Sequence, residues 1–251
     1  MIELQDITVG YGEKPVLNEL SLTLPKGKLL SLIGANGSGK STLLKAIVGI
    51  AQCSTGKILI DGKPSTEMSR REPAKKIAYL PQGKSVPDMT VGQMVLHGRF
   101  PHLHYPRRYG EKDRQIARDA LRKMGLESQI DRPLSSLSGG MRQNAYIAMA
   151  LTQDADYILL DEPTTYLDIA NQVELMHILR TLTGSGKGVV TVMHDLPLAF
   201  GFSDSIAAIR NGRIAVCDTP QAVCGTGIVS EIFGIELRYA AGENVYHYCY
   251  T

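Results

Sequence analysis

The stretch Gly34-Ala-Asn-Gly-Ser-Gly-Lys-Ser41 decides the fold class of this chain. It follows a short apolar run at residues 29–33 and precedes residues 41–48, in which apolar side chains recur at helical spacing. Phosphate oxygens need a ring of backbone N–H groups, and glycines let the chain turn tightly enough to supply them. Lys40 would add positive charge at the phosphates, and the Ser41 hydroxyl can ligate Mg²⁺. A chance glycine-rich turn is the alternative, but the strand–loop–helix context favours a phosphate-binding loop.

A second element ends in two acidic residues. The apolar run at residues 157–160 is followed by Asp161 and Glu162. In a parallel sheet this places both carboxylates at the carboxyl edge, beside the phosphate loop. Asp161 would hold Mg²⁺ through water, and Glu162 would orient or activate a water that attacks the γ-phosphate. Taken alone, an Asp-Glu pair after a strand is more often a solvated turn; the phosphate loop reverses that preference.

Outward from these motifs, strand-like and helix-like segments alternate. Strands are expected at residues 4–9, 20–24, 57–60, 188–193 and 205–209, with a helix at 169–181. Asn211-Gly212 predicts a hairpin after the last of these strands. Strand-like runs disappear between residues 86 and 150, where residues 111–124 form one amphipathic helix. We therefore expect an α/β fold: a P-loop NTPase core with a mainly parallel sheet, an N-terminal antiparallel β portion and an inserted α-helical subdomain.

Length and composition limit the remaining possibilities. The 251 residues include 43% hydrophobic and 21% charged residues, which can fill a globular core. We expect one domain, with a core of residues 1–85 and 151–251 and a helical subdomain at about 86–150. The formal net charge of +2 disfavours a protein held by nucleic-acid phosphates. No apolar run is long enough to span a bilayer, no signal peptide is visible, and the four cysteines are expected to be reduced thiols.

The segment Leu137-Ser-Gly-Gly-Met-Arg-Gln143, together with the two motifs above, resembles the signature of ATP-binding-cassette (ABC) ATPases. The resemblance implies that Tyr11 stacks on adenine, although a Tyr-Gly pair also suits an ordinary turn. It implies that Gln82 links the γ-phosphate and Mg²⁺ to a membrane partner, and that Asp168 lies in a loop contacting the opposite subunit. His194 would sense the γ-phosphate; a lone histidine after a strand is otherwise commonly structural.

Ser138, Gly139 and Gly140 precede an apolar helix at about residues 141–151, so they form either an anion-binding helix N-terminus or only a cap. In the family this segment caps ATP across a head-to-tail dimer. The resemblance thus implies ATP and Mg²⁺ as ligands, catalysis by Glu162, His194, Lys40 and Gln82, and Mg²⁺ at Ser41, Gln82 and Asp161. The implied ATP-binding residues are Tyr11, Gly34, Asn36, Gly37, Ser38, Gly39, Lys40, Ser41, Thr42, Gln82 and Asp161, with Ser138, Gly139, Gly140 and Asp168 acting across the dimer.

Several stretches are similar to one bacterial importer group, among them Gly98-Arg-Phe-Pro-His102. That group takes up iron–siderophore, haem, cobalamin or metal-oxyanion cargo. The resemblance implies a second copy of the chain, two transmembrane permease subunits, and a periplasmic or surface binding protein acting indirectly, at the cytoplasmic face of the bacterial inner membrane. The insertion and the loop around Gln82 would form the groove for a permease helix. Pro197 and the segment Tyr246-His-Tyr-Cys-Tyr250 depart from the group's pattern.

Other functions are compatible with parts of the sequence. A soluble cassette ATPase acting on nucleic acid or ribosomes is the main alternative, but those usually carry two cassettes or a long coiled-coil insertion. A non-catalytic regulatory subunit would not need Lys40, Asp161, Glu162 and His194 together. Export is disfavoured by the importer-like stretches. The spacing of His97, His102 and His104 matches no standard metal site and favours a surface or partner-contact loop.

Overall fold

Two β-sheets face each other in the computed structural model, which describes residues 1–12, 14–69, 71–83, 85–240 and 245–249. The larger sheet has the strand order β10-β9-β3-β8-β7-β6 and is parallel except for β10. The smaller sheet, β2-β1-β4-β5, is antiparallel, and a separate hairpin joins β11 to β12. The strands are β1 Ile2–Tyr11, β2 Lys14–Leu24, β3 Leu29–Ile33, β4 Cys53–Ile60, β5 Lys63–Pro64, β6 Ile77–Leu80, β7 Tyr157–Asp161, β8 Gly188–Val192, β9 Ser205–Arg210, β10 Arg213–Asp218, β11 Glu236–Ala240 and β12 Val245–Cys249.

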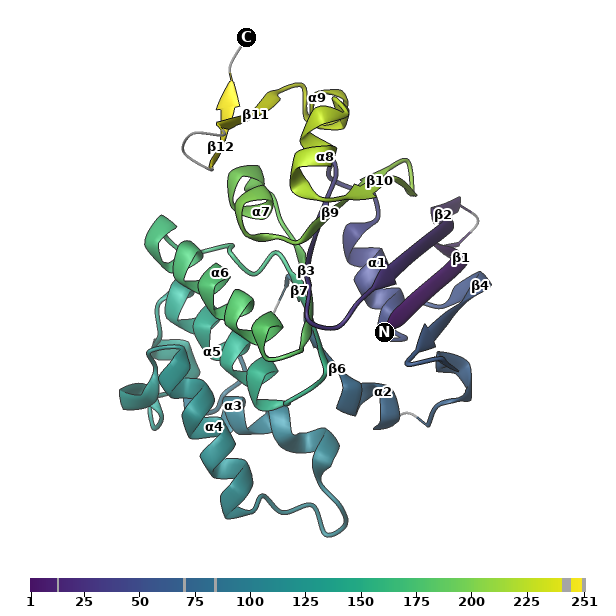
Figure 1. Cartoon of the computed structure of the whole chain (residues 1–251). Coiled ribbons are helices and arrows are strands. Elements are labelled where there is room, and N and C mark those ends of the chain that lie inside the picture. The colour runs from purple at the N-terminus through teal and green to yellow at the C-terminus, as the bar shows by residue number, and fades with distance from the viewer. Residues whose placement is uncertain (13, 70, 84, 241–244, 250–251) are drawn as a thin grey trace.

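The large sheet is buried on both faces, which is why its inner strands are mostly apolar, with Ser31, Thr191 and Asp161 as buried polar residues. In β3, Leu30 and Leu32 pack toward helix α1 (Lys40–Ile47) and the antiparallel sheet, while Leu29 and Ile33 pack toward the other layer. Figure 1 shows α1 between the two sheets, and α5 (Gly139–Thr152) and α6 (Ile169–Gly184) on the opposite side of the large sheet. Because successive side chains of β3 point to opposite faces of the sheet, this strand contributes to two hydrophobic cores, one on each face.

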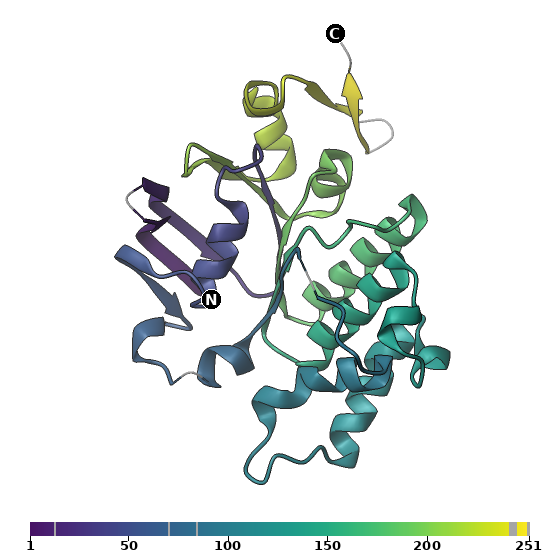
Figure 2. The same ribbon diagram turned by 180° about the vertical axis from the view of Figure 1, so that it is seen from behind.

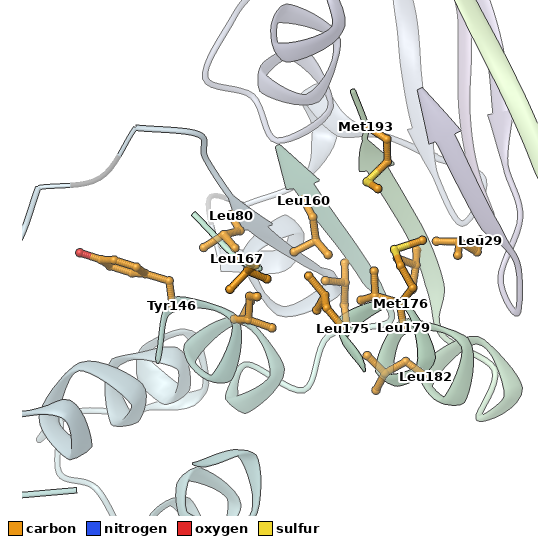
Figure 3. Close-up of a cluster of buried hydrophobic side chains, with 14 of the residues drawn as sticks. Leu29, Leu80, Tyr146, Leu160, Leu167, Leu175, Met176, Leu179, Leu182 and Met193 are labelled. Carbon is orange, nitrogen blue, oxygen red and sulfur yellow. The ribbon is translucent and has the colours of Figure 1, made fainter. Parts of the chain in front are cut away.

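Helix α6 (Ile169–Gly184) closes the second of these cores. Its residues Leu175, Met176, Leu179 and Leu182 recur at helical spacing and lie against strand residues such as Leu160 (Figure 3). The helices outside the insertion are α1, α2 Arg71–Lys76, α6, α7 Leu196–Phe202, α8 Pro220–Gly225 and α9 Ile228–Phe233, with a 3-10 turn η1 at Ser65–Glu67. This packing holds the carboxyl ends of β3, β7 and β8 at one edge.

Between β6 and β7 the described residues form helices and no strand. Figure 2 shows this helical part as a lobe beside the sheet. Its elements are α3 Val91–Leu96, η2 His97–His102, α4 Glu111–Lys123, η3 Glu127–Gln129, η4 Leu134–Ser136 and α5 Gly139–Thr152. Thr90 caps α3 with a reciprocal bond to Gln93, and α4 buries Ala117, Ala120 and Leu121.

The expected fold class is confirmed, but several elements differ from the sequence prediction. Strand β2 begins at Lys14 rather than at residue 20, because it pairs with β1 as far as Tyr11↔Lys14. Strand β6 was missed because its four residues carry little periodic signal, and it is defined by pairing with β7. The sequence prediction also did not include the β11–β12 hairpin. Tyr250 of the unusual C-terminal segment lies outside the described residues.

Candidate active site

The phosphate loop connects β3 to α1 and is shaped by two glycines. Gly34 has φ 154°, and a Cβ there would lie 2.5 Å from the Ile209 carbonyl oxygen. Gly39 has φ 105°, a conformation that side-chain-bearing residues rarely adopt. The loop folds over the Lys40 ammonium, which donates to the Gly34 and Ala35 carbonyls at 2.7 and 2.9 Å. The motif predicted from the sequence therefore forms the expected compact cradle.

Lys40 is a buried cation at the centre of this cradle. Burial lowers its pKa, while the neighbouring carboxylates of Glu162 and Asp161 act in the opposite direction. The Ser38 hydroxyl is also buried, and none of the residues that the structure describes forms a hydrogen bond with it. A buried hydroxyl without a partner is costly, so its environment fits a polar ligand held by the loop. Both observations agree with binding of phosphate oxygens.

Ser41 and Asp161 lie together although 120 residues separate them. The Ser41 hydroxyl donates to Asp161 Oδ1 at 3.0 Å, because α1 and the end of β7 meet at the same sheet edge. Burial raises the pKa of Asp161, opposed by the Ser41 bond and by Lys45 and Lys40. A hydroxyl next to a carboxylate is an oxygen donor set of the kind that Mg²⁺ prefers, so these two residues fit that cation.

The Glu162 carboxylate lies between two side-chain partners. The Glu162 backbone has φ 52°, a left-handed conformation that costs free energy in a residue with a side chain. Glu162 Oε1 lies 2.7 Å from His194 Nε2, and Glu162 Oε2 accepts from Gln82 Nε2 at 2.6 Å. Because a carboxylate oxygen accepts, the geometry fits an imidazole with its proton on Nε2. Three predicted catalytic residues, from three separate strand ends, therefore form one hydrogen-bonded group.

A cavity of about 720 Å³ joins this group to the phosphate loop. Its lining contains most of the predicted site residues of one chain. They are Asn36, Gly37, Gly39, Lys40, Ser41, Thr42, Gln82, Glu162 and His194, together with Val16. Val16 was not predicted, because its place depends on the packing of β2 over the loop, which no local sequence signal shows.

The other predicted residues lie outside this lining. Tyr11 ends β1 with 62% of its surface exposed. Ser138 is the N-cap of α5 and accepts from the Met141 N–H at 3.3 Å, and Asp168 caps α6 through the Asn171 N–H at 2.9 Å. Gly139 and Gly140 pack against Tyr166, so the signature and the Asp168 loop form one surface. Of the two possibilities that the sequence left open, an anion-binding helix N-terminus or only a cap, the contacts within one chain show Ser138 as a cap.

Two further side chains connect the signature helix to the site, and sequence analysis did not single them out. The Gln143 amide, which lies within the quoted signature, donates to the Pro163 carbonyl at 2.6 Å, next to Glu162. The Tyr146 hydroxyl points away from the core cluster (Figure 3) and donates to the Ser85 carbonyl at 2.7 Å, after the Gln82 loop. Gln143 could have been found from the sequence, because it is the last residue of the quoted signature, but only Ser138, Gly139 and Gly140 of that segment were considered as site residues.

Of the three histidines named for the insertion, His97 and His102 contact backbone carbonyls, and His104 is exposed. His97 Nδ1 lies 2.8 Å from the Gln93 carbonyl oxygen, and His102 Nε2 lies 2.8 Å from that of Gln153. Within the described ranges, His, Cys, Asp and Glu side chains form no group of three or more that would suit a metal ion. In the same part of the chain, none of the helices combines the length and the apolar character that a bilayer crossing needs.

Comparison with known proteins places this geometry in a family. The model of the ABC transporter family matches residues 17–165, which include the phosphate loop, the signature and the acidic strand. The chain belongs to the ABC transporter family. It is an ATP-binding transport ATPase, and cassettes of this family dimerise and pair with permeases in transporter complexes.

Individual relatives cover nearly the whole chain. The petrobactin import ATP-binding protein FpuD of Bacillus anthracis is 40% identical over 94% of this chain and 88% of its own length. The iron(3+)-hydroxamate import ATP-binding protein FhuC of Bacillus subtilis is 38% identical over 94% and 88%.

Among solved structures, an inward-facing protein assigned to the metal-chelate type of ABC transporter has a TM-score of 0.84 at 26% identity, over 100% of this chain and 98% of that one. A dimeric bacterial ABC transporter cassette has a TM-score of 0.78 at 29% identity, over 88% and 99%.

Proposed function

We propose that this chain is the ATP-hydrolysing subunit of a bacterial importer of iron chelates such as siderophores. The observation that carries the catalytic part is the Glu162 carboxylate, held by His194 and Gln82 at the mouth of the phosphate cavity. The cargo class is supported by relatives named for petrobactin and iron(3+)-hydroxamate import. Cargo would be selected by the permease and a periplasmic or surface binding protein.

The residues divide the work of phosphoryl transfer to water. Lys40 and the loop N–H groups would hold the phosphates, and Glu162 would orient the attacking water and accept its proton. His194 would contact the γ-phosphate and steady the Glu162 carboxylate. Ser41 and Asp161, with Gln82, would hold Mg²⁺, which when bound neutralises charge on the phosphate oxygens. Every one of these groups lies on or beside the cavity.

The surface formed by the signature and the Asp168 loop would meet a second copy of the chain, head to tail. Ser138, Gly139 and Gly140 do not line this chain's own cavity, so they are free to reach the ATP of the other copy. Tyr166 and Ile169 are each 79% exposed beside them, which is unusual for large apolar side chains and fits a surface covered on dimerisation. Tyr11 would stack on the adenine at the rim.

A second cavity, of about 650 Å³, lies between the core and the helical insertion. It is lined by Met68, Tyr79, Pro101 and the 65% exposed Ile50, among others. We propose that the cavity of each copy receives a short cytoplasmic helix from one of the two permease subunits. The chain would act as one domain, whose insertion spans about residues 86–150. Among the described residues at the end of β6 and after it, Tyr79 lines this groove and Gln82 lines the phosphate cavity.

The catalytic proposal is tested by Glu162→Gln in the purified chain. We expect ATP turnover to fall by about 100-fold or more, because the amide cannot accept a proton, while ATP binding and ATP-dependent dimerisation persist. Phosphate release, nucleotide titration and light scattering measure the three properties. Glu67→Gln, at an exposed glutamate, is the matched control. Turnover at the wild-type rate in Glu162→Gln would remove Glu162 from this role.

The transport proposal is tested by purification from detergent-solubilised membranes. We expect a permease to copurify with the chain and ATP turnover to rise when the complex is reconstituted with its binding protein. The groove proposal adds that Ile50→Glu, which places a charge in the apolar lining, should release the chain from the membrane fraction. Recovery of the chain only with ribosomes or nucleic acid would contradict the transporter assignment.

A further inference from the structure

The two stretches that depart from the importer group's pattern meet at the start of α7. Pro197 is the second residue of this helix, and Tyr248 lies on β12. The Leu196 N–H donates to the Tyr248 hydroxyl oxygen at 3.2 Å, across 52 positions of sequence. Helix α7 begins two residues after His194, so the contact lies next to the catalytic group.

The N–H groups in the first turn of α7 have acceptors outside the helical ladder. A helix begins with N–H groups that have no acceptor within the helix. Leu196 uses Tyr248, Pro197 has no N–H, and the Leu198 N–H donates to Asp195 Oδ1 at 2.9 Å. Leu196 is only 2% exposed, so water cannot readily replace the tyrosine. Pro197 and Tyr248 thus complete one cap.

Aromatic packing holds the hairpin against α7. Tyr246 packs on the buried Phe200 at a ring distance of 5.3 Å, and Tyr239 packs on Tyr246 at 4.9 Å. The Cys224 thiol donates to the Leu237 carbonyl at 3.0 Å, tying β11 to α8. The Tyr248 hydroxyl is therefore presented from a supported strand.

His194 needs such support, because its own side chain is 46% exposed. A single residue, Asp195, separates it from Leu196, whose position the cap sets. We infer that Tyr248 is a positioning residue for His194: its hydroxyl anchors the start of α7 and so holds the imidazole against Glu162. The inference rests on the role proposed above for His194.

The test compares Tyr248→Phe with Tyr246→Phe. Tyr248→Phe removes only the hydroxyl, and the control removes a hydroxyl from the same strand while keeping the ring on Phe200. We expect Tyr248→Phe to lower kcat for ATP about three- to tenfold with KM nearly unchanged, the rate equivalent of one lost hydrogen bond. The NMR resonance of the His194 ring, identified among the six histidines by its absence in His194→Ala, should shift in Tyr248→Phe. Tyr246→Phe should change neither.

An unshifted His194 resonance in Tyr248→Phe, or equal loss of kcat in both variants, would overturn the inference, since either result would give the hairpin a merely structural role. Different results would contradict the proposed function itself. Wild-type protein without ATP turnover, or His194→Ala with full turnover, would contradict the role of His194. In that case the resonance shift still tests the link between Tyr248 and His194.

Discussion

Gly98 has no room for a side chain where the insertion crosses the end of α5. A Cβ at this position would lie 2.2 Å from the Met149 carbonyl oxygen and 3.0 Å from Thr152 Cβ. This close approach explains why a glycine stands at position 98. In the sequence, the Gly98–His102 stretch indicated only a similarity to one importer group. The glycine is required by packing against residues about 50 positions away, which a local sequence motif does not predict.

Gly98→Ala should therefore destabilise the protein. We expect the free energy of unfolding to fall by about 1–3 kcal/mol, because the backbone must move to admit the methyl group. Urea unfolding followed by circular dichroism measures the change. Gly184→Ala is the matched control: its Cβ would meet nothing within 4 Å, so stability should hold or rise slightly. A Gly98→Ala protein as stable as wild type would contradict the close approach.

At the scale of elements, Arg99 joins three helices of the insertion. From η2, its Nε donates to Asp113 of α4 at 3.0 Å and its Nη1 donates to the Thr152 carbonyl of α5 at 3.2 Å. Burial alone would raise the pKa of Asp113, but the Gly110 N–H and Arg99 hold it below its ordinary value. The Gln153 amide then donates to the Ala74 and Ile77 carbonyls at 2.6 and 2.8 Å, which ties the insertion to β6.

Arg99→Met tests this junction. Removing the guanidinium leaves the Asp113 carboxylate with only the Gly110 N–H as a donor and takes the Arg99 bond from the Thr152 carbonyl, so the free energy of unfolding should fall by about 3 kcal/mol. Chemical denaturation measures the change. Arg122→Met, which breaks exposed pairs with Asp119 and Glu127, should have little effect. Equal effects of the two substitutions would show that burial does not strengthen the Arg99 pair.

At the scale of the whole molecule, Asp204 connects the sheet to the helical layer. It accepts from the Leu29 N–H at 2.8 Å and from Arg180 of α6 at 2.7 Å, and Lys28 lies nearby. Burial alone would raise the pKa of Asp204, but the Leu29 N–H and Arg180 outweigh it and the pKa is lowered. A carboxylate with a lowered pKa stabilises the fold in its ionised form.

The stability should accordingly depend on acid pH through Asp204. The contribution is complete above the unfolded pKa of about 3.9 and is lost as pH falls through the lower folded value. At pH 7, Asp204→Asn should cost about 2 kcal/mol. In urea unfolding, the difference in the free energy of unfolding between wild type and variant should stay constant down to about pH 4 and narrow as the pH falls further. Asp88→Asn, at an exposed aspartate, should leave stability nearly unchanged at each pH; a constant gap for Asp204→Asn would contradict the linkage.

The phosphate loop, the Asp161–Glu162 pair and the α/β fold class were predicted from the residues themselves, whereas the role of His194 was predicted from the family resemblance. The loop and the acidic pair can be recognised because each consists of a few adjacent residues, and the fold class because strand-like and helix-like segments alternate along the chain. Which of these groups lie together depends on the tertiary structure. Gln82 bonds Glu162 across 80 positions, Val16 lines the cavity, and Tyr248 supports the start of α7. Such contacts follow from sheet order and the packing of separate layers, which a local pattern does not specify.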